Sequence, residues 1–107
     1  MSTSSIDTNI RKKLPLEEAQ ARLGQIPGWG LKDAKLHREF AFRDFQEAFA
    51  FMAQAAWLSE KLDHHPEWSN VYNKVTVDLT THSAKGISEL DFAWAGAANR
   101  ALKENLA

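Results

Sequence analysis

The chain of 107 residues contains no cysteine. Disulfide bonds, cysteine-ligated zinc or iron–sulfur centres and thiolate nucleophiles are therefore excluded. The chain also lacks an excess of charge of either sign, since 13 lysines and arginines stand against 14 aspartates and glutamates and leave a net charge of −1. That balance argues against binding of nucleic acid or a membrane surface through bulk positive charge. The available chemistry rests on hydroxyls, carboxylates and four histidines.

Long hydrophobic runs are missing as well. No stretch approaches the roughly 20 apolar residues of a membrane-spanning helix, and residues 1–9 have no apolar segment typical of a secretory signal. The hydrophobic fraction of 44% is typical of a globular domain and too high for a disordered chain. No linker or internal repeat divides the chain. We therefore expect a single domain over residues 1–107, with about residues 1–12 as a flexible tail, in a cytoplasmic protein (or also a nuclear one in a eukaryote).

Hydrophobic spacing and turn residues predict three helices and four strands. In chain order they are a helix over 14–26, two strands within 29–42 with a turn at Lys32-Asp33, a helix over 43–62, a strand containing Val71-Tyr72 with a turn near Asn73-Lys74, a strand from Val75 to near His82, and a helix from Leu90 onward. Strands that are adjacent in sequence and joined by short turns pair antiparallel. The order α-β-β-α-β-β-α thus predicts an α+β fold, with a four-stranded antiparallel sheet and three helices packed on one face.

The helix over residues 43–62 is apolar around an unusually wide arc. Phe45, Phe49, Met52 and Ala56 fall on one stripe at 100° per residue, and further apolar residues widen the arc to about half the helix surface. Two interpretations remain open. The helix is either deeply buried in the core or covered on its second side by another subunit.

Three of the four histidines are predicted to lie near one another. His64 and His65 follow the long helix at a proline, and His82 lies where a strand ends. Side chains at the ends of helices and strands often build sites in small domains. Because histidine titrates near neutrality, two or three in one cleft supply both an acid and a base at pH 7.

Other interpretations of the same residues stay open. The histidines can simply close a helix end, and Glu60, His64 and His82 have a spacing compatible with a metal site. Asp91 is the fourth residue of Ser88-Glu89-Leu90-Asp91, which has the spacing of a capping box at a helix start. A purely structural duty for Asp91 is therefore one alternative.

The spacing of these residues resembles one enzyme family. The pattern is Glu60, three residues, His64-His65-Pro66, five residues, Tyr72, nine residues, His82, eight residues, Asp91. It resembles the pterin-4a-carbinolamine dehydratases, and the segment EKLDHHPEWSNVYNKV is similar to the most recognisable part of that family. The resemblance extends upstream through Gly28-Trp29 and the helix FRDFQEAFAFM, and covers roughly residues 14–94.

The resemblance implies a specific activity. These enzymes remove water from the 4a-hydroxytetrahydropterin that aromatic amino-acid hydroxylases leave behind, and the product is a quinonoid dihydropterin that a reductase recycles. In the family, the histidines that match His64, His65 and His82 line the pterin site and perform the acid–base steps. The family fold is an antiparallel four-stranded sheet with helices on one side. Its members form dimers and tetramers, and some also act as a dimerisation cofactor for a homeodomain transcription factor.

The chemistry expected at such a site needs only side chains. Loss of water from the 4a carbon requires a proton for the departing hydroxide and removal of the proton on the neighbouring ring nitrogen. Neither step requires a metal, a redox cofactor or a covalent nucleophile, so we expect no cofactor. Glu60 and Asp91 are candidates to set the protonation states of the histidines, and Trp29 or Trp68 to stack on the pterin ring. Which histidine is the acid and which the base stays open.

Overall fold

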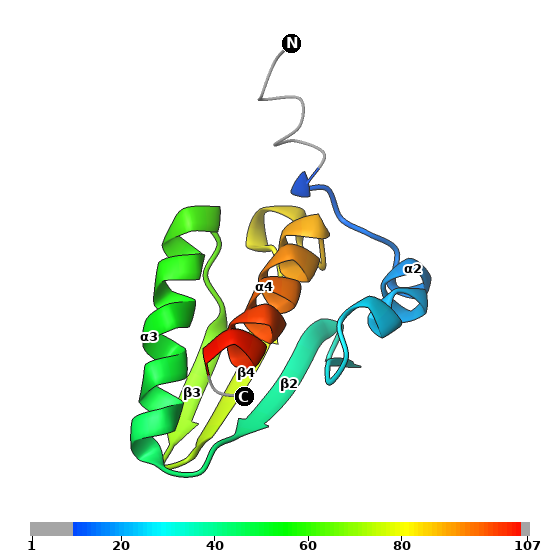
Figure 1. Ribbon diagram of the computed structural model, residues 1–107. Helices are drawn as coiled ribbons and strands as arrows, with labels where there is room; N and C mark the ends of the chain where they lie inside the picture. The colour runs from blue at the N-terminus through cyan, green and yellow to red at the C-terminus, as the bar shows by residue number, and fades with distance from the viewer. Residues whose placement is uncertain (1–9, 106–107) are drawn as a thin grey trace.

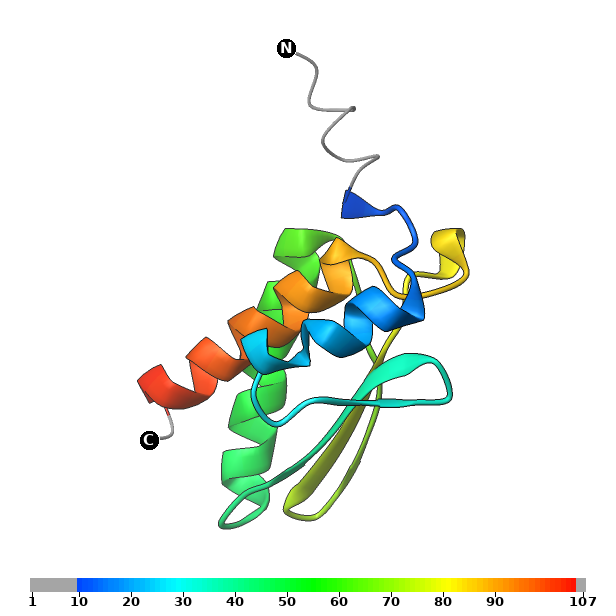
Figure 2. The same ribbon diagram turned by 90° about the vertical axis from the view of Figure 1, so that its right-hand side faces the viewer.

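The computed structural model describes residues 10–105. Its elements are, in chain order, helix α2 (Leu16–Ala21), 3₁₀ helix η1 (Leu23–Gln25), strands β1 (Gly30–Lys32) and β2 (Lys35–Ala41), helix α3 (Phe45–Leu62), strands β3 (Glu67–Val71) and β4 (Lys74–Leu79), 3₁₀ helix η2 (His82–Ala84) and helix α4 (Glu89–Asn105). Within the described range, the strands form one antiparallel sheet in the order β1-β2-β4-β3. Figures 1 and 2 show α3 and α4 side by side over one face of this sheet, with α2 beside them. The predicted fold is thus confirmed.

Both hairpin turns lie one residue away from their predicted positions. Lys32 pairs with Lys35, so the first turn is Asp33-Ala34, and both residues have the positive φ of a two-residue hairpin loop. Tyr72, predicted to lie in a strand, is the turn residue of the second hairpin, with φ of 51°. The strand before it, predicted only to contain Val71 and Tyr72, begins at Glu67. Glu67 therefore lies in the sheet, opposite Asp78.

The hydrophobic core lies between the sheet and the helices. Leu36 and Phe40 of β2 and Val75, Val77 and Leu79 of β4 are almost fully buried, because alternate residues of a strand point to the same face. The buried core residues are Ala19, Ile26, Trp29, Leu36, Phe40, Ala48, Phe51, Ala55, Val75, Val77, Leu79, Ile87, Phe92, Trp94, Ala95 and Ala98. The alternation of residues 36–42 and 75–79 read from the sequence is the pattern observed at the buried positions.

Helix α3 has a defined start and end. Asp44 is its N-cap and accepts a hydrogen bond from the Glu47 amide at 2.9 Å, so the helix begins at Phe45 rather than at the predicted Arg43. It ends, as predicted, at Leu62, and Asp63 follows in the left-handed conformation with φ of 51°. His64 therefore directly follows Asp63, the residue that ends the helix.

The core covers only one side of the predicted apolar arc of α3. Ala48, Phe51, Ala55 and Ser59 face the core, whereas Phe45 and Phe49 of the predicted stripe are 45% and 57% exposed. A second difference concerns the first helix, which is divided into α2 and η1 where residues 14–26 were expected to form one helix.

The ends of the chain lie mostly outside the described residues. Of the predicted tail over residues 1–12, residues 10–12 are described, and Arg11 Nη2 lies 3.8 Å from Asp63 Oδ2. None of the helices within residues 10–105 is long and apolar enough to cross a membrane.

Candidate active site

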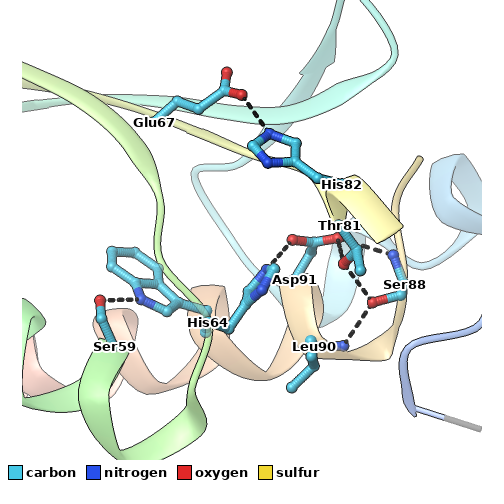
Figure 3. A network of polar contacts seen from close by, with 9 residues as sticks. Ser59, His64, Glu67, Thr81, His82, Ser88, Leu90 and Asp91 are labelled. Atoms are coloured by element: carbon cyan, nitrogen blue, oxygen red, sulfur yellow. Dashed lines mark hydrogen bonds and ion pairs between the residues drawn. The ribbon is translucent and has the colours of Figure 1, made fainter. Parts of the chain in front are cut away.

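His64 is buried and bound to an acid. Its side chain is 8% exposed, and its Nε2 lies 2.5 Å from Oδ1 of Asp91, which is fully buried. The His64 amide also donates to the Ser59 carbonyl of α3 at 3.0 Å. Ser59 Oγ in turn accepts a bond from Trp94 Nε1 of α4 at 2.9 Å. The ends of two helices thus fix the position of the His64 ring (Figure 3).

Asp91 serves the helix start and the histidine at once. Its Oδ2 accepts the Ser88 amide at 2.8 Å and the Thr81 hydroxyl at 2.9 Å, while Ser88 Oγ accepts the Leu90 amide at 3.2 Å. This is the capping box expected at Ser88. The other oxygen of the same carboxylate binds His64. Asp91 thus has the structural duty at the helix start and also contacts a candidate catalytic histidine. Both oxygens of this buried carboxylate therefore have hydrogen-bond partners.

His65 and its acid are exposed to solvent. His65 Nε2 lies 2.7 Å from Oε2 of Glu60, which belongs to the last turn of α3. The two side chains are 57% and 75% exposed. Glu60 was a candidate to act on the histidines, and the structure joins it to His65 rather than to His64.

His82 binds an acid that the sequence reasoning missed. β4 ends at Leu79, and His82 begins the short helix η2 after Thr81 has paired with Gly86. His82 Nε2 lies 2.9 Å from Oε2 of Glu67, at the start of β3. Glu67 Oε1 accepts a bond from Lys35 Nζ at 2.6 Å. Donation by Lys35, followed by that from His82, lowers the pKa of Glu67 below its ordinary value, so Glu67 is ionised at neutral pH.

The three histidines share one arrangement. Each has its Nε2 on a carboxylate oxygen: His64 on Asp91, His65 on Glu60 and His82 on Glu67. Thr81, which binds Asp91, directly precedes His82, and His64 directly precedes His65. Two segments distant in sequence therefore meet at Asp91, as Figure 3 shows. With Nε2 of each ring on a carboxylate oxygen, Nδ1 is the other ring nitrogen that can donate or accept a hydrogen bond.

The two tryptophans proposed to stack on a ligand lie in or against the core. Trp29 is 6% exposed, packs edge-on against Phe40 and Trp94, and donates to Asn99 Oδ1 at 3.1 Å. Trp68 is partly buried and packs edge-on against Trp94. These are the contacts of packing residues, and the structure does not bring Trp29 to any of the three histidines.

The three residues considered as a possible metal site each contact a different partner. Glu60 binds His65, His64 binds Asp91 and His82 binds Glu67. Within residues 10–105, no group of three or more histidine, aspartate or glutamate side chains is arranged to hold a metal ion.

The comparison with protein families decides the classification. The family model described as pterin 4 alpha carbinolamine dehydratase matches residues 12–101. The chain belongs to this family. The pterin-4a-carbinolamine dehydratase resemblance seen in the sequence is thereby confirmed, and the matched range contains every candidate residue described above.

Individual relatives agree with this classification. A protein of Prochlorococcus marinus that carries the provisional name pterin-4-alpha-carbinolamine dehydratase is 48% identical over 86 residues, which is 80% of this chain and 90% of that protein. One of Chelativorans, with the same provisional name, is 50% identical over 84 residues, 77% of this chain and 86% of the relative. A crystal structure from Brucella melitensis, described as a transcriptional coactivator/pterin dehydratase, has a TM-score of 0.80 and 47% identity, and the match covers 83% of this chain and 97% of that one.

Three residues that contact the candidate site residues were not singled out as site residues by the sequence. Glu67 lies within the quoted segment EKLDHHPEWSNVYNKV, but it was given no role, because Pro66 gave no sign that β3 begins at the next residue. Thr81 and Ser88 join Asp91 in a buried network in which their hydroxyls lie 2.6 Å apart. The Ser88-to-Asp91 spacing was the available signal for this network. For Thr81, the only signal in the sequence was its position directly before His82.

Proposed function

We propose that the protein removes water from a 4a-hydroxytetrahydropterin to give the quinonoid dihydropterin by histidine acid–base catalysis. It would thereby serve the recycling of the tetrahydrobiopterin cofactor of aromatic amino-acid hydroxylases. Family membership supports the reaction class. The observation that supports the mechanism is the set of three histidines that each bind a carboxylate through Nε2 and come from two segments joined at Asp91.

The proposed reaction transfers one proton to the substrate and removes one proton from it. A protonated histidine donates to the hydroxyl oxygen as the bond to the 4a carbon breaks, and water leaves. A neutral histidine accepts the proton of the neighbouring ring nitrogen, whose electron pair forms the new double bond to carbon. The two histidines end in exchanged protonation states and are reset by solvent. Each such proton transfer contributes a factor of about 10²–10⁴ to the rate.

The histidine–acid pairs suit both roles. With Nε2–H bound to a carboxylate, a neutral ring presents the lone pair of Nδ1 as a base, and a charged ring presents Nδ1–H as an acid. His64 is held rigidly in a buried position, whereas His65 and His82 are exposed and equilibrate with water. The set thus combines one fixed imidazole with two that exchange protons with solvent.

The test is turnover of a freshly generated 4a-hydroxytetrahydropterin by single variants. His64→Ala, His65→Ala and His82→Ala should each lower kcat by about 10²-fold or more while the circular dichroism spectrum stays unchanged. His37→Ala is the matched control, since His37 forms a comparable pair with Asp78, 2.7 Å apart, on the sheet. Full activity of a His64→Ala/His65→Ala double variant would refute the mechanism.

We further propose that the outer face of α3 packs against a second copy of this chain, giving a homodimer or homotetramer. Phe45, Phe49 and Trp57 lie four and eight residues apart and are 45%, 57% and 80% exposed. Residues 48–59 of the helix carry no charge, and exposed alanines lie between the rings. An uncharged helical stripe with small residues between large ones suits close packing against an identical helix. The wide apolar arc in the sequence is then explained by two covered sides.

Light scattering tests the assembly. Phe49→Glu should reduce the mass to that of the monomer or of a smaller assembly, and Gln54→Glu, which adds the same charge elsewhere on the helix, should not. A wild-type protein that is monomeric at all concentrations would overturn self-association. The alternative occupant is a transcription factor, since the Brucella melitensis structure is described as a transcriptional coactivator as well. It would be supported by a monomeric protein that forms a complex with a homeodomain protein through this face.

A further inference from the structure

A hollow of about 340 Å³ lies at the opposite end of α4 from Asp91. It is lined by residues of the segment before β1, of β2 and of the last turns of α4: Gln25, Pro27, Arg38, Gly96, Asn99, Arg100, Leu102 and Lys103. Arg38, Arg100 and Lys103 contribute three positive charges, and no aspartate or glutamate is among the described residues that line the hollow. Its size is at the lower end of the range for small-molecule sites.

The guanidinium of Arg38 is held in a fixed position. Its Cζ lies 4.4 Å from the centre of the Phe40 ring. It also lies so close to Gly28 that a Cβ added there would be 2.6 Å from Cζ. Nη1 donates to Asn99 Oδ1 at 2.7 Å and to the Pro27 carbonyl at 3.2 Å. Asn99 is itself oriented by the Trp29 indole and by its own bond to Pro27.

Within the described part of the chain, Arg38 nevertheless has no carboxylate partner. Among residues 10–105, Arg11, Arg22 and Arg43 each lie within 4 Å of a carboxylate oxygen, and Arg22 binds both oxygens of Glu89. Arg38 has only neutral acceptors on Nη1, and its Nε and Nη2 make no hydrogen bond to the described residues. Burial lowers the pKa of Arg38, since no carboxylate offsets the cost of taking its charge out of water.

We propose that this hollow binds a phosphate group, with Nε and Nη2 of Arg38 as the donor edge and Arg100 and Lys103 as additional cations. A guanidinium with one free edge matches two oxygens of a phosphate in a bidentate arrangement. Three positive charges favour a doubly charged anion over a single carboxylate. Pro27 and Leu102 offer apolar surface beside the cations. The phosphate comes either from free inorganic phosphate or from a small phosphomonoester whose carbon skeleton lies on that surface.

The test is nuclear magnetic resonance of the ¹⁵N-labelled full chain, titrated with inorganic phosphate and with phenyl phosphate at constant ionic strength. The Arg38 Nε–H and Asn99 side-chain amide signals should shift in a saturable manner. The ring signals of His64, His65 and His82 should not follow the same curve. Tighter binding of phenyl phosphate assigns the ligand as a phosphomonoester, and equal binding assigns it as free phosphate. Both results support the site.

Substitutions identify the groups that bind. Arg38→Gln should weaken binding about tenfold or more, because it removes a bidentate charged contact. Arg100→Gln and Lys103→Gln, at exposed positions, should each weaken it as well, and they keep the test valid should Arg38→Gln fail to fold. Arg43→Gln, which removes the same charge outside the hollow, should leave binding unchanged. The proposal is overturned by the absence of saturable shifts, or by equal binding in all four variants. It does not depend on dehydratase activity, so the two proposals fail separately.

Discussion

Replacement of Asp91 by asparagine tests whether the buried carboxylate controls the proton on His64. Asparagine has the same shape, and its oxygen can accept the Ser88 amide and the Thr81 hydroxyl that Asp91 Oδ2 accepts now. Its amide nitrogen then faces Nε2 of His64 where Oδ1 stood, 2.5 Å away. Two N–H groups cannot point at each other, so neutral His64 must move its proton to Nδ1. The atom that exchanges protons with the substrate would lose its lone pair.

The expected effects differ in size for activity and for stability. Loss of one general acid or base in its correct protonation state lowers kcat by about 10²–10⁴-fold, which raises the activation barrier by about 3–5 kcal/mol. The fold retains its helix cap and loses only the charge assistance of buried hydrogen bonds, which costs about 1–2 kcal/mol. For a domain of this size that lowers Tm by roughly 5–15 °C. The variant should therefore be folded at 25 °C and nearly inactive.

Two measurements check the reasoning. Turnover of the 4a-hydroxytetrahydropterin gives kcat, and ¹⁵N chemical shifts of the His64 ring identify the protonated nitrogen, which should change from Nε2 to Nδ1. Asp78→Asn is the matched control, because it makes the same change in the pair of Asp78 with His37 and should leave kcat within about twofold of wild type. An Asp91→Asn protein with the wild-type tautomer and wild-type kcat would refute the assignment.

Three shorter predictions follow from other contacts. Glu67→Gln removes the ionised acceptor of His82 and should shift the acidic limb of the kcat–pH profile, whereas a purely structural residue would leave the profile in place. Glu89→Gln should make the free energy of unfolding fall less steeply in acid. The Arg22 hydrogen bonds lower the pKa of Glu89 below its usual 4.5, so their contribution of under about 1 kcal/mol is present above that pH and is lost as the pH falls through the folded-state pKa. Urea denaturation of both proteins at pH 3–7 measures the difference. Gly28→Ala should lower the free energy of unfolding by about 1–3 kcal/mol, because residue 28 has φ of +90° and its Cβ would meet a guanidinium, and a melting curve unchanged from wild type would contradict this.

The sequence predicted the fold because each signal was local. Alternation along residues 36–42 and 75–79 marked the buried strands, and helical spacing with the capping box at Ser88 marked α4. The turns were misplaced by one residue because Asp33, Ala34 and Tyr72 adopt positive φ without glycine, which propensity does not favour. Which part of the apolar arc of α3 faces the core could not be predicted. Phenylalanines lie on both the buried and the exposed side of the helix, and periodicity alone cannot tell a core from a subunit interface.

The histidines of the site were predictable, but their acids were only partly so. Glu60 and Asp91 stood out by spacing, yet the sequence could not show that Glu60 binds His65 while Asp91 binds His64. Glu67 was missed because its contact with His82 depends on where β3 begins. That contact joins residues 15 positions apart, and only the register of the sheet brings them together.

The buried Asp91 couples the stability of the helix to the chemistry proposed for His64. One of its oxygens closes the start of α4 and the other binds the imidazole, so a shift of the helix start would move the imidazole as well. His65 and His82 have no such link, because their acids lie on exposed side chains of α3 and β3. Thr81→Val tests the two duties. It removes the hydroxyl that donates to Oδ2 and lies 2.6 Å from Ser88 Oγ, while the Ser88 amide can still donate to Oδ2. If the cap alone positioned His64, Thr81→Val would change kcat little. If the full set of donors to the carboxylate is required, kcat should fall about tenfold or more with a loss of stability of only about 1–2 kcal/mol. Turnover and urea denaturation of this one variant distinguish the two cases.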